Sequence, residues 1–332
     1  MKINFLTLNK NENTASYRIW VKDLNDTLVE LGYESKIKTR LNEIDKDVQV
    51  LILCKSAYKY SKQYRDIVGK SVKIGAINID RSYFCKDLDF VIVGSPEEYS
   101  SISKYRNVFI HPLVERKFKN TTRKVHKNDD HRLKLCFHGN YPHLFKFHPF
   151  LKDAIEYYDK NIKKVNLKVI TGNKDFDWKV GRPDVEIEML NYDDNISSYI
   201  KSCDIGLVPN LTDGRLYRKD TETLTSVEFG LYDSDYLLRY KNKTNAGRAY
   251  VFYQHGIPVI HDLSPSSFEL MKLTGYNVCA HDSESWLREL KYLSNIDTRE
   301  AVSKSYYQAF KDHYDTHEIA KELIQKIRKI NE

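Results

Sequence analysis

The sequence has no long hydrophobic run. None of its 332 residues falls in an apolar stretch of about 18 residues, the length that a membrane-spanning helix needs. Residues 1–8 resemble a strand and lack the basic region and cleavage site of a signal peptide. With 41% hydrophobic and 30% charged residues, the composition predicts a soluble, globular, cytoplasmic protein.

Cysteine is scarce, and its spacing does not suggest a metal site. The five cysteines are Cys54, Cys85, Cys136, Cys203 and Cys279, and no two of them form a Cys-x-x-Cys pair. Three of them stand beside apolar runs. We therefore expect buried free thiols in a reducing compartment.

Motifs for nucleic-acid and dinucleotide binding are also missing. The chain has no zinc finger, RNP motif or long basic helix, so its net charge of +7 does not indicate a nucleic-acid partner. The loop at residues 9–16 lacks Gly-x-Gly-x-x-Gly, which disfavours NAD. The positive charge is compatible with a phosphorylated substrate or an anionic membrane surface.

Strands alternate with helices in the first part of the chain. Residues 48–54 form a nearly continuous apolar run, which is typical of a parallel strand covered on both faces. We expect strands at 3–8, 36–38, 48–54, 72–77, 90–94 and 108–110, and helices at 19–31, 58–68 and 95–104. This order predicts a doubly wound parallel sheet of the α/β class.

The second part repeats this organisation after a polar, charged linker at residues 116–130. We expect strands at 133–137, 167–170, 185–189, 205–208 and 259–260, and helices at 150–158, 194–202, 268–273, 286–293 and 301–330. The predicted organisation is a first domain over 1–115, a second over 131–300, and a helical segment over 301–332 that packs back on the first domain.

The clearest signal for a binding site is a turn that leads into a further helix of the second domain. Asn245 is predicted to cap this helix, and Gly247 lets another group approach the backbone. Arg248 adds a cation to a first turn whose N–H groups already attract anions. Gly256 and Pro258 end the helix before a short strand. This pattern alone suits a phosphate site and an ordinary helix–strand connection with one surface arginine about equally, and the rest of the chain decides between them.

Ligands of parallel sheets bind at the carboxyl ends of the strands. In the first domain this rule selects two cations, Arg18 and Lys55, and one carboxylate, Asp80, each of which has a surface or capping role as the alternative. In the second domain, residues 211–244 form a long segment rich in charge and tyrosine. A loop of this length inside a compact domain is either functional or disordered, and we interpret it as a lid or substrate-contact element.

Several short runs resemble those of the GT-B glycosyltransferases of family 4, also called group 1. The resemblance covers most of the chain and is carried by residues 90–95 (Phe-Val-Ile-Val-Gly-Ser), 108–112 (Val-Phe-Ile-His-Pro), 137–140 (Phe-His-Gly-Asn), 204–209 (Asp-Ile-Gly-Leu-Val-Pro) and 247–260. It implies two Rossmann-like domains that face a cleft. It also implies transfer of a sugar from a nucleotide-diphosphate sugar to a cell-surface glycan or a lipid-linked acceptor, without a metal or other cofactor.

The resemblance also implies roles for individual residues. Arg248 matches the basic residue that faces the donor pyrophosphate, and Asp80 is the candidate general base. Arg18 and Lys55 belong to the acceptor side. The expected donor-binding residues are Gly139, Asn140, Gly172, Asn191, Tyr192, Pro209, Asn210, Arg215, Lys219, Asn245, Gly247 and Arg248.

One position departs from the family pattern. Val251 stands where the family often has a glutamate that holds the nucleotide ribose, and Asp213 and Glu228 are distant candidates for the other glutamate of the family pair. Two alternatives to a transferase therefore stay open. One is a non-catalytic GT-B-like nucleotide-binding or partner subunit, and the other is a sugar-nucleotide epimerase.

Two further features allow more than one interpretation. The basic residues at 116–127 and 321–329 are suited to peripheral contact with the inner face of the plasma membrane, but they are equally suited to a solvated surface. His138, His143 and His148 lie close in sequence, yet histidines in a loop are more often polar surface residues than metal ligands.

Overall fold

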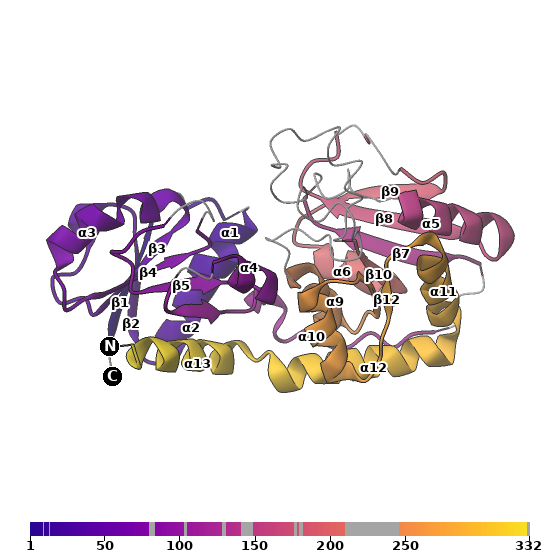
Figure 1. Ribbon diagram of the computed structural model, residues 1–332. Coiled ribbons are helices and arrows are strands. Elements are labelled where there is room, and N and C mark those ends of the chain that lie inside the picture. Colours follow the sequence, from indigo (N-terminus) through magenta and orange to yellow (C-terminus); the bar gives the residue numbers. More distant parts are fainter. Residues whose placement is uncertain are drawn as a thin grey trace. The chain divides into compact units, whose positions relative to one another are not determined.

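The computed structural model describes residues 1–8, 10–12, 14–79, 84–102, 105–127, 131–140, 149–175, 178, 182–209 and 246–330 (Figure 1). The chain forms two compact units, Met1–Lys119 together with Tyr314–Glu332, and Asn120–His313. The first boundary falls inside the predicted linker. The residues of the predicted C-terminal segment are divided between the two units.

The first unit is built on a six-stranded sheet with the order β2-β1-β3-β4-β5-β6, in which every neighbouring pair is parallel. Its strands are β1 (Lys2–Thr7), β2 (Glu34–Lys38), β3 (Val50–Cys54), β4 (Lys73–Ile77), β5 (Phe90–Val93) and β6 (Val108–Ile110). The parallel sheet predicted from the alternation of strands and helices is therefore confirmed.

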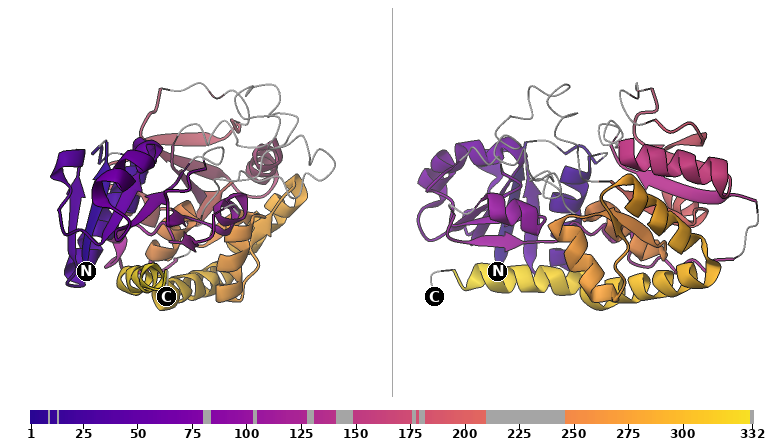
Figure 2. Two further views of the ribbon diagram at one scale, coloured as in Figure 1. Left: turned by 60° about the vertical axis from the view of Figure 1, so that its left-hand side comes forward. Right: turned by 45° about the vertical axis from the view of Figure 1, so that its right-hand side comes forward.

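Helices cover both faces of this sheet (Figures 1 and 2). They are α1 (Ala15–Tyr17), the π-helical turn η1 (Arg18–Asp23), α2 (Leu24–Glu30), α3 (Ser61–Val68), α4 (Pro96–Ser101), α13 (Thr316–Arg328) and the 3₁₀ turns η2 (Leu41–Glu43), η3 (Lys55–Tyr60) and η4 (Arg116–Phe118). Successive residues of a strand point to opposite faces. Accordingly, Ile52 of β3 belongs to the core with α2 and α13, whereas Leu51 and Leu53 belong to the core with η3 and α3.

Helix α13 packs beside α2 although it lies at the other end of the sequence (Figures 1 and 2). Its apolar stripe includes Leu323, Ile324 and Ile327, all of which are buried in the core of the first unit. Lys73 donates hydrogen bonds from Nζ to the carbonyl oxygens of Ile327 and Arg328, at 3.1 and 2.7 Å. A cation at this position satisfies the last carbonyls of the helix, so the C-terminus of the helix is tied to β4.

The second unit has a six-stranded parallel sheet with the order β12-β11-β10-β7-β8-β9. Its strands are β7 (Leu133–His138), β8 (Val165–Thr171), β9 (Glu186–Asn191), β10 (Ile205–Val208), β11 (Val259–Asp262) and β12 (Cys279–Ala280), and its helices are α5 (Pro149–Asn161), α6 (Ile196–Lys201), α9 (Gly247–His255), α10 (Pro265–Thr274), α11 (Ser283–Ser294) and α12 (Ile296–His313). None of the helices that the structure describes is both long and apolar enough to cross a membrane.

Two details correct the predicted elements. The structure adds the short edge strand β12, whose two residues are too few to show a periodic pattern. The single helix predicted over 301–330 is two helices, because a new N-cap interrupts it. Asp315 accepts hydrogen bonds from the backbone N–H groups of His317 and Glu318 and starts α13.

Three buried histidines favour their neutral form. His111 is 7% exposed, His126 is 5% exposed and His261 is fully buried. Loss of solvation lowers the pKa of His111 and His126 to about 4 and that of His261 to about 3. Between pH 6.5 and 4 the unfolded chain therefore binds protons that the folded chain does not bind. Folding stability should accordingly fall as the pH falls through this window.

We expect the midpoint of thermal unfolding to decrease between pH 7 and pH 5, which circular dichroism can follow. A His111→Phe variant should show a weaker dependence on pH. It removes one titrating ring but keeps an aromatic ring beside Trp20, whose centroid is 6.2 Å from that of His111. An unchanged slope in this variant would contradict the assignment of His111.

Candidate functional site

Helix α9 begins where the sequence placed the anion site, with one correction. Its first residue is Gly247 and its N-cap is Ala246 rather than Asn245, which lies outside the described residues. Gly256 ends the helix with φ 68° and ψ 37°, the left-handed conformation predicted for it. Arg248 is thus the second residue of a nine-residue helix, in the turn where the helix dipole favours anions.

Residues at the end of strand β7 and directly after strand β10 lie close to Arg248. The guanidinium carbon lies 5.4 Å from the centroid of the Phe137 ring. His138 Nε2 lies 2.9 Å from the main-chain oxygen of Arg248. A Cβ on Gly139 would lie 3.2 Å from Arg248 Cδ, closer than ordinary van der Waals contact, so a side chain at this position would press on the arginine stem. From β10, the carbonyl of Pro209 accepts a hydrogen bond of 3.2 Å from Nη2.

Arg248 is a desolvated cation. Burial lowers its pKa to about 10, and the carboxylate of Asp262, at the end of β11, acts in the opposite direction. The side chain therefore stays charged at neutral pH. A charge with little water around it interacts with an anion more strongly than a surface arginine does. The local chemistry is that of a binding site for phosphate or diphosphate.

The other described donor-side residues lie along the same edge of the sheet. Asn140 follows β7, Gly172 follows β8 and Tyr192 follows β9, whose last residue is Asn191. Thr171 pairs with Asn191 in register, and Gly139 N donates to Ile170 O at 3.0 Å. Neighbouring strands are about 4.8 Å apart, so the ends of β7 and β9 are separated by about 10 Å. These strand ends therefore lie on one edge of the sheet, within the length of a small ligand.

Several predicted site residues cannot be placed. Asp80, Asn210, Arg215, Lys219 and Asn245 lie outside the described residues, as do Asp213, Glu228, His143, His148 and the rest of the segment 211–244; of Lys55 only the backbone is described, at the start of η3.

Position 251 belongs to the interior of the second unit. Val251 is 1% exposed, and its carbonyl oxygen lies 2.7 Å from His255 Nδ1. A carboxylate at this buried position would lose its hydration, which is costly. The valine that stands in place of the family's glutamate therefore agrees with the burial of position 251 in α9.

His138 has a role that sequence reasoning did not assign to it. Its ring packs edge-on against Phe252, at 4.9 Å between centroids. Phe252 in turn lies against Gly206, where a Cβ would come within 2.7 Å of the ring. The signal in the sequence for this role of His138 was the run Phe-His-Gly at a strand end.

Among the described residues, no group of three His, Cys, Asp or Glu side chains is arranged to hold a metal ion.

In the first unit, Arg18 forms an ion pair within the protein. Its Nη2 lies 2.9 Å from Glu115 Oε1, and the two side chains are 16% and 7% exposed. Nη1 also donates to Glu12 O at 3.2 Å. The charge predicted to face an acceptor is therefore largely balanced by a buried carboxylate.

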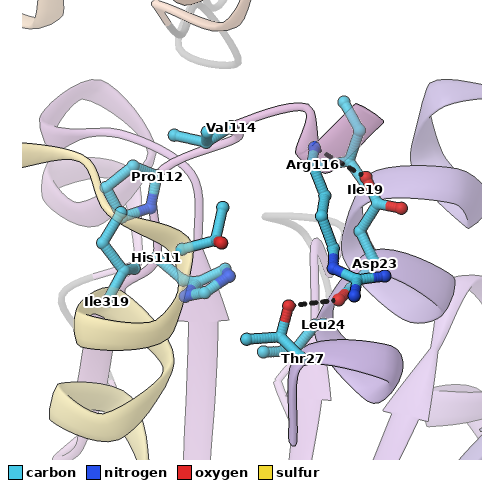
Figure 3. A pocket seen from close by; sticks show the side chains of 10 residues that line it. Ile19, Asp23, Leu24, Thr27, His111, Pro112, Val114, Arg116 and Ile319 are labelled. Carbon is cyan, nitrogen blue, oxygen red and sulfur yellow. Dashed lines mark hydrogen bonds between the residues drawn. The ribbon is translucent and has the colours of Figure 1, made fainter. Parts of the chain in front are cut away.

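A small pocket of the first unit lies between η1, α2, the chain after β6 and the start of α13 (Figure 3). Half of its lining residues are apolar, and the other half are polar or charged, among them Asp23, His111 and Arg116. The backbone N–H of Arg116 donates to Asp23 Oδ2 at 3.2 Å. Burial raises the pKa of Asp23, partly offset by this hydrogen bond.

Comparisons with known proteins identify the fold. No protein-family model matches the chain, and no curated protein matches it. HepE of Anabaena, solved with UDP and glucose, is similar over 99% of both chains at a TM-score of 0.59 and 10% identity. The E. coli trehalose-6-phosphate synthase, solved with UDP-2-fluoro glucose, is similar over 99% of both chains at a TM-score of 0.61 and 8% identity.

A third similar structure is a DNA-modifying enzyme, β-glucosyltransferase, solved with and without uridine diphosphoglucose. It has a TM-score of 0.60 and 11% identity, over 98% of this chain and 99% of the other. The shared architecture is the GT-B fold, as the sequence resemblance implied. At these identities the likeness concerns the fold alone.

Replacing Arg18 tests whether its charge serves the structure. We expect Arg18→Met to lower the free energy of unfolding by about 3 kcal/mol, because Glu115 then keeps a buried charge without its ion pair to Arg18, and Lys117 Nζ, 3.7 Å from Oε2, offsets only part of this loss. The double variant Arg18→Met/Glu115→Gln should recover part of this loss. Urea unfolding measures both.

The matched control is Lys321→Met, which breaks an exposed pair of the same unit, Lys321–Glu318 at 2.6 Å. Its effect on the free energy of unfolding should be much smaller than that of Arg18→Met, because solvent screens this exposed pair. Equal effects of Arg18→Met and Lys321→Met would contradict the structural role and return Arg18 to the acceptor side.

Proposed function

We propose that this protein is a glycosyltransferase that uses a nucleotide-diphosphate sugar as its donor. The observation that carries the proposal is Arg248, a desolvated cation on the first turn of α9, at the carboxyl edge of a parallel sheet in a GT-B fold. A helix N-terminus and an arginine together suit a diphosphate, which carries charge in both the bound donor and the departing product.

Uridine is the proposed base of the donor. HepE, the trehalose-6-phosphate synthase and β-glucosyltransferase were each solved with UDP or a UDP-sugar. In this chain, the exposed Asn191 and the half-buried Tyr192 at the end of β9 offer an amide and an aromatic ring to a base. The end of β9 lies about two strand spacings from the end of β7, whose residues contact Arg248, and this separation supports the placement.

The reaction that we propose needs no metal ion. When the sugar leaves the nucleotide, negative charge grows on the diphosphate, and a fixed guanidinium can stabilise it without an added cation. Asp80 in the first unit remains our candidate for the base that takes the proton of the acceptor hydroxyl. The proposed acceptor is a glycan or a lipid-linked sugar, reached at the inner face of the plasma membrane.

A non-catalytic nucleotide-binding subunit is the second candidate, and the buried Val251 favours it. No carboxylate is presented from this position. Both candidates predict UDP binding, whereas only the transferase predicts turnover. Release of UDP from a UDP-sugar, with water or a glycan as acceptor, separates them.

We expect Arg248→Ala to weaken UDP binding by about tenfold to a hundredfold, as for the loss of a charge-assisted hydrogen bond. Isothermal titration calorimetry measures the affinity, and thermal unfolding without ligand shows whether the variant is folded. Arg288→Ala is the control, because Arg288 also belongs to the second unit but is 65% exposed in α11, where it pairs with Glu289. It should bind UDP as the wild type does.

Wild-type affinity in a folded Arg248→Ala variant would refute the role of Arg248. Absence of UDP binding to the wild type at millimolar concentration would refute uridine. A parallel titration with GDP, CMP and ADP would then decide whether the site takes another nucleotide.

A further inference from the structure

We infer that three consecutive residues at the end of β7, Phe137, His138 and Gly139, hold Arg248 in the orientation that binds the diphosphate. This inference rests on the proposed function and adds positioning residues to it. Each of the three contacts a different part of Arg248. Phe137 lies against the guanidinium, His138 hydrogen-bonds the main chain, and Gly139 accommodates the stem.

The hydrogen bond from His138 to the main chain of Arg248 determines which tautomer the imidazole ring adopts. The partner of Nε2 is the carbonyl oxygen of Arg248, which can only accept, so Nε2 carries the proton. The ring cannot turn away easily, because it is buried and packs edge-on against Phe252. The first turn of α9 is thereby tied to the end of β7 by a bond between residues that are 110 positions apart.

Gly139 allows the Arg248 stem to pass close to the backbone. Its φ of 141° lies in the region that favours glycine, and a side chain would meet Arg248 Cδ at 3.2 Å. The stem of Arg248 thus runs directly over the backbone of β7. Together with the Phe137 ring and the Pro209 carbonyl, this contact directs the guanidinium to the carboxyl edge of the sheet.

The functional consequence is preorganisation. An arginine side chain has many rotamers, and ordering it on ligand binding weakens affinity. The contacts from β7 order Arg248 before the ligand arrives. Removing them should therefore weaken diphosphate binding although Arg248 and its charge are unchanged.

The test compares His138→Leu with His138→Gln. Both variants lose the ring contact with Phe252, but glutamine keeps an N–H donor at a reach similar to that of Nε2. We expect His138→Leu to bind UDP about tenfold more weakly than the wild type, the equivalent of one hydrogen bond. His138→Gln should recover most of this loss. The two variants should have similar midpoints of thermal unfolding, so a merely structural role would not separate them.

A second pair of variants tests the steric contact. Gly139→Ala should weaken UDP binding because its methyl group displaces the Arg248 stem. Gly275→Ala is the matched control. Gly275 also has a left-handed backbone, with φ 71°, but has no neighbour within 4 Å of an added Cβ. Its substitution imposes backbone strain without touching Arg248, so UDP affinity should not change.

Hydrogen exchange in the absence of ligand makes the test independent of the proposed function. Amides at the start of α9 should exchange faster in His138→Leu than in the wild type or His138→Gln. If the wild type fails to bind UDP, the donor proposal fails, and exchange still reports on the positioning. Equal UDP affinity and equal exchange in wild type, His138→Leu and His138→Gln would overturn the positioning inference itself.

Discussion

The contact between Phe252 and Gly206 holds helix α9 on the sheet of the second unit. The ring lies so close to the β10 backbone that a Cβ on Gly206 would come within 2.7 Å of it. At the end of the helix, the Gly256 carbonyl lies 2.6 Å from Ser303 Oγ and 3.0 Å from His126 Nε2. The helix is therefore fixed at its middle and at its C-terminus, and the position of its first turn follows from these two constraints.

The first turn of α9 carries Arg248, the residue on which the proposed chemistry depends. Arg248 is partly exposed as a residue, yet its guanidinium has lost enough water to lower its pKa to about 10. Keeping a charge in such surroundings is unfavourable unless something compensates it. The Pro209 carbonyl, the Phe137 ring and the charge of Asp262 each do so in part. An anionic ligand would compensate it further, which links the stability of the site to its occupancy.

The first unit uses its charges differently. Arg18 and Glu115 neutralise each other in a pair that is mostly buried, and Asp23 hydrogen-bonds the backbone of Arg116. These groups join the π-helical turn after β1 to the chain that follows β6. The described charged groups at this place therefore stabilise the first unit through contacts with one another and not through a ligand.

The features that depend on local pattern could be predicted from the sequence alone. Alternating strands and helices predicted two parallel sheets, and Gly256 predicted a left-handed helix end, both of which the structure confirms. Which distant residues meet is visible only in the folded structure. The Arg18–Glu115 pair spans 97 positions and the His138–Arg248 bond spans 110, and no periodicity encodes such separations. Strand order sets these meetings, and strand order depends on how all the apolar faces are buried together.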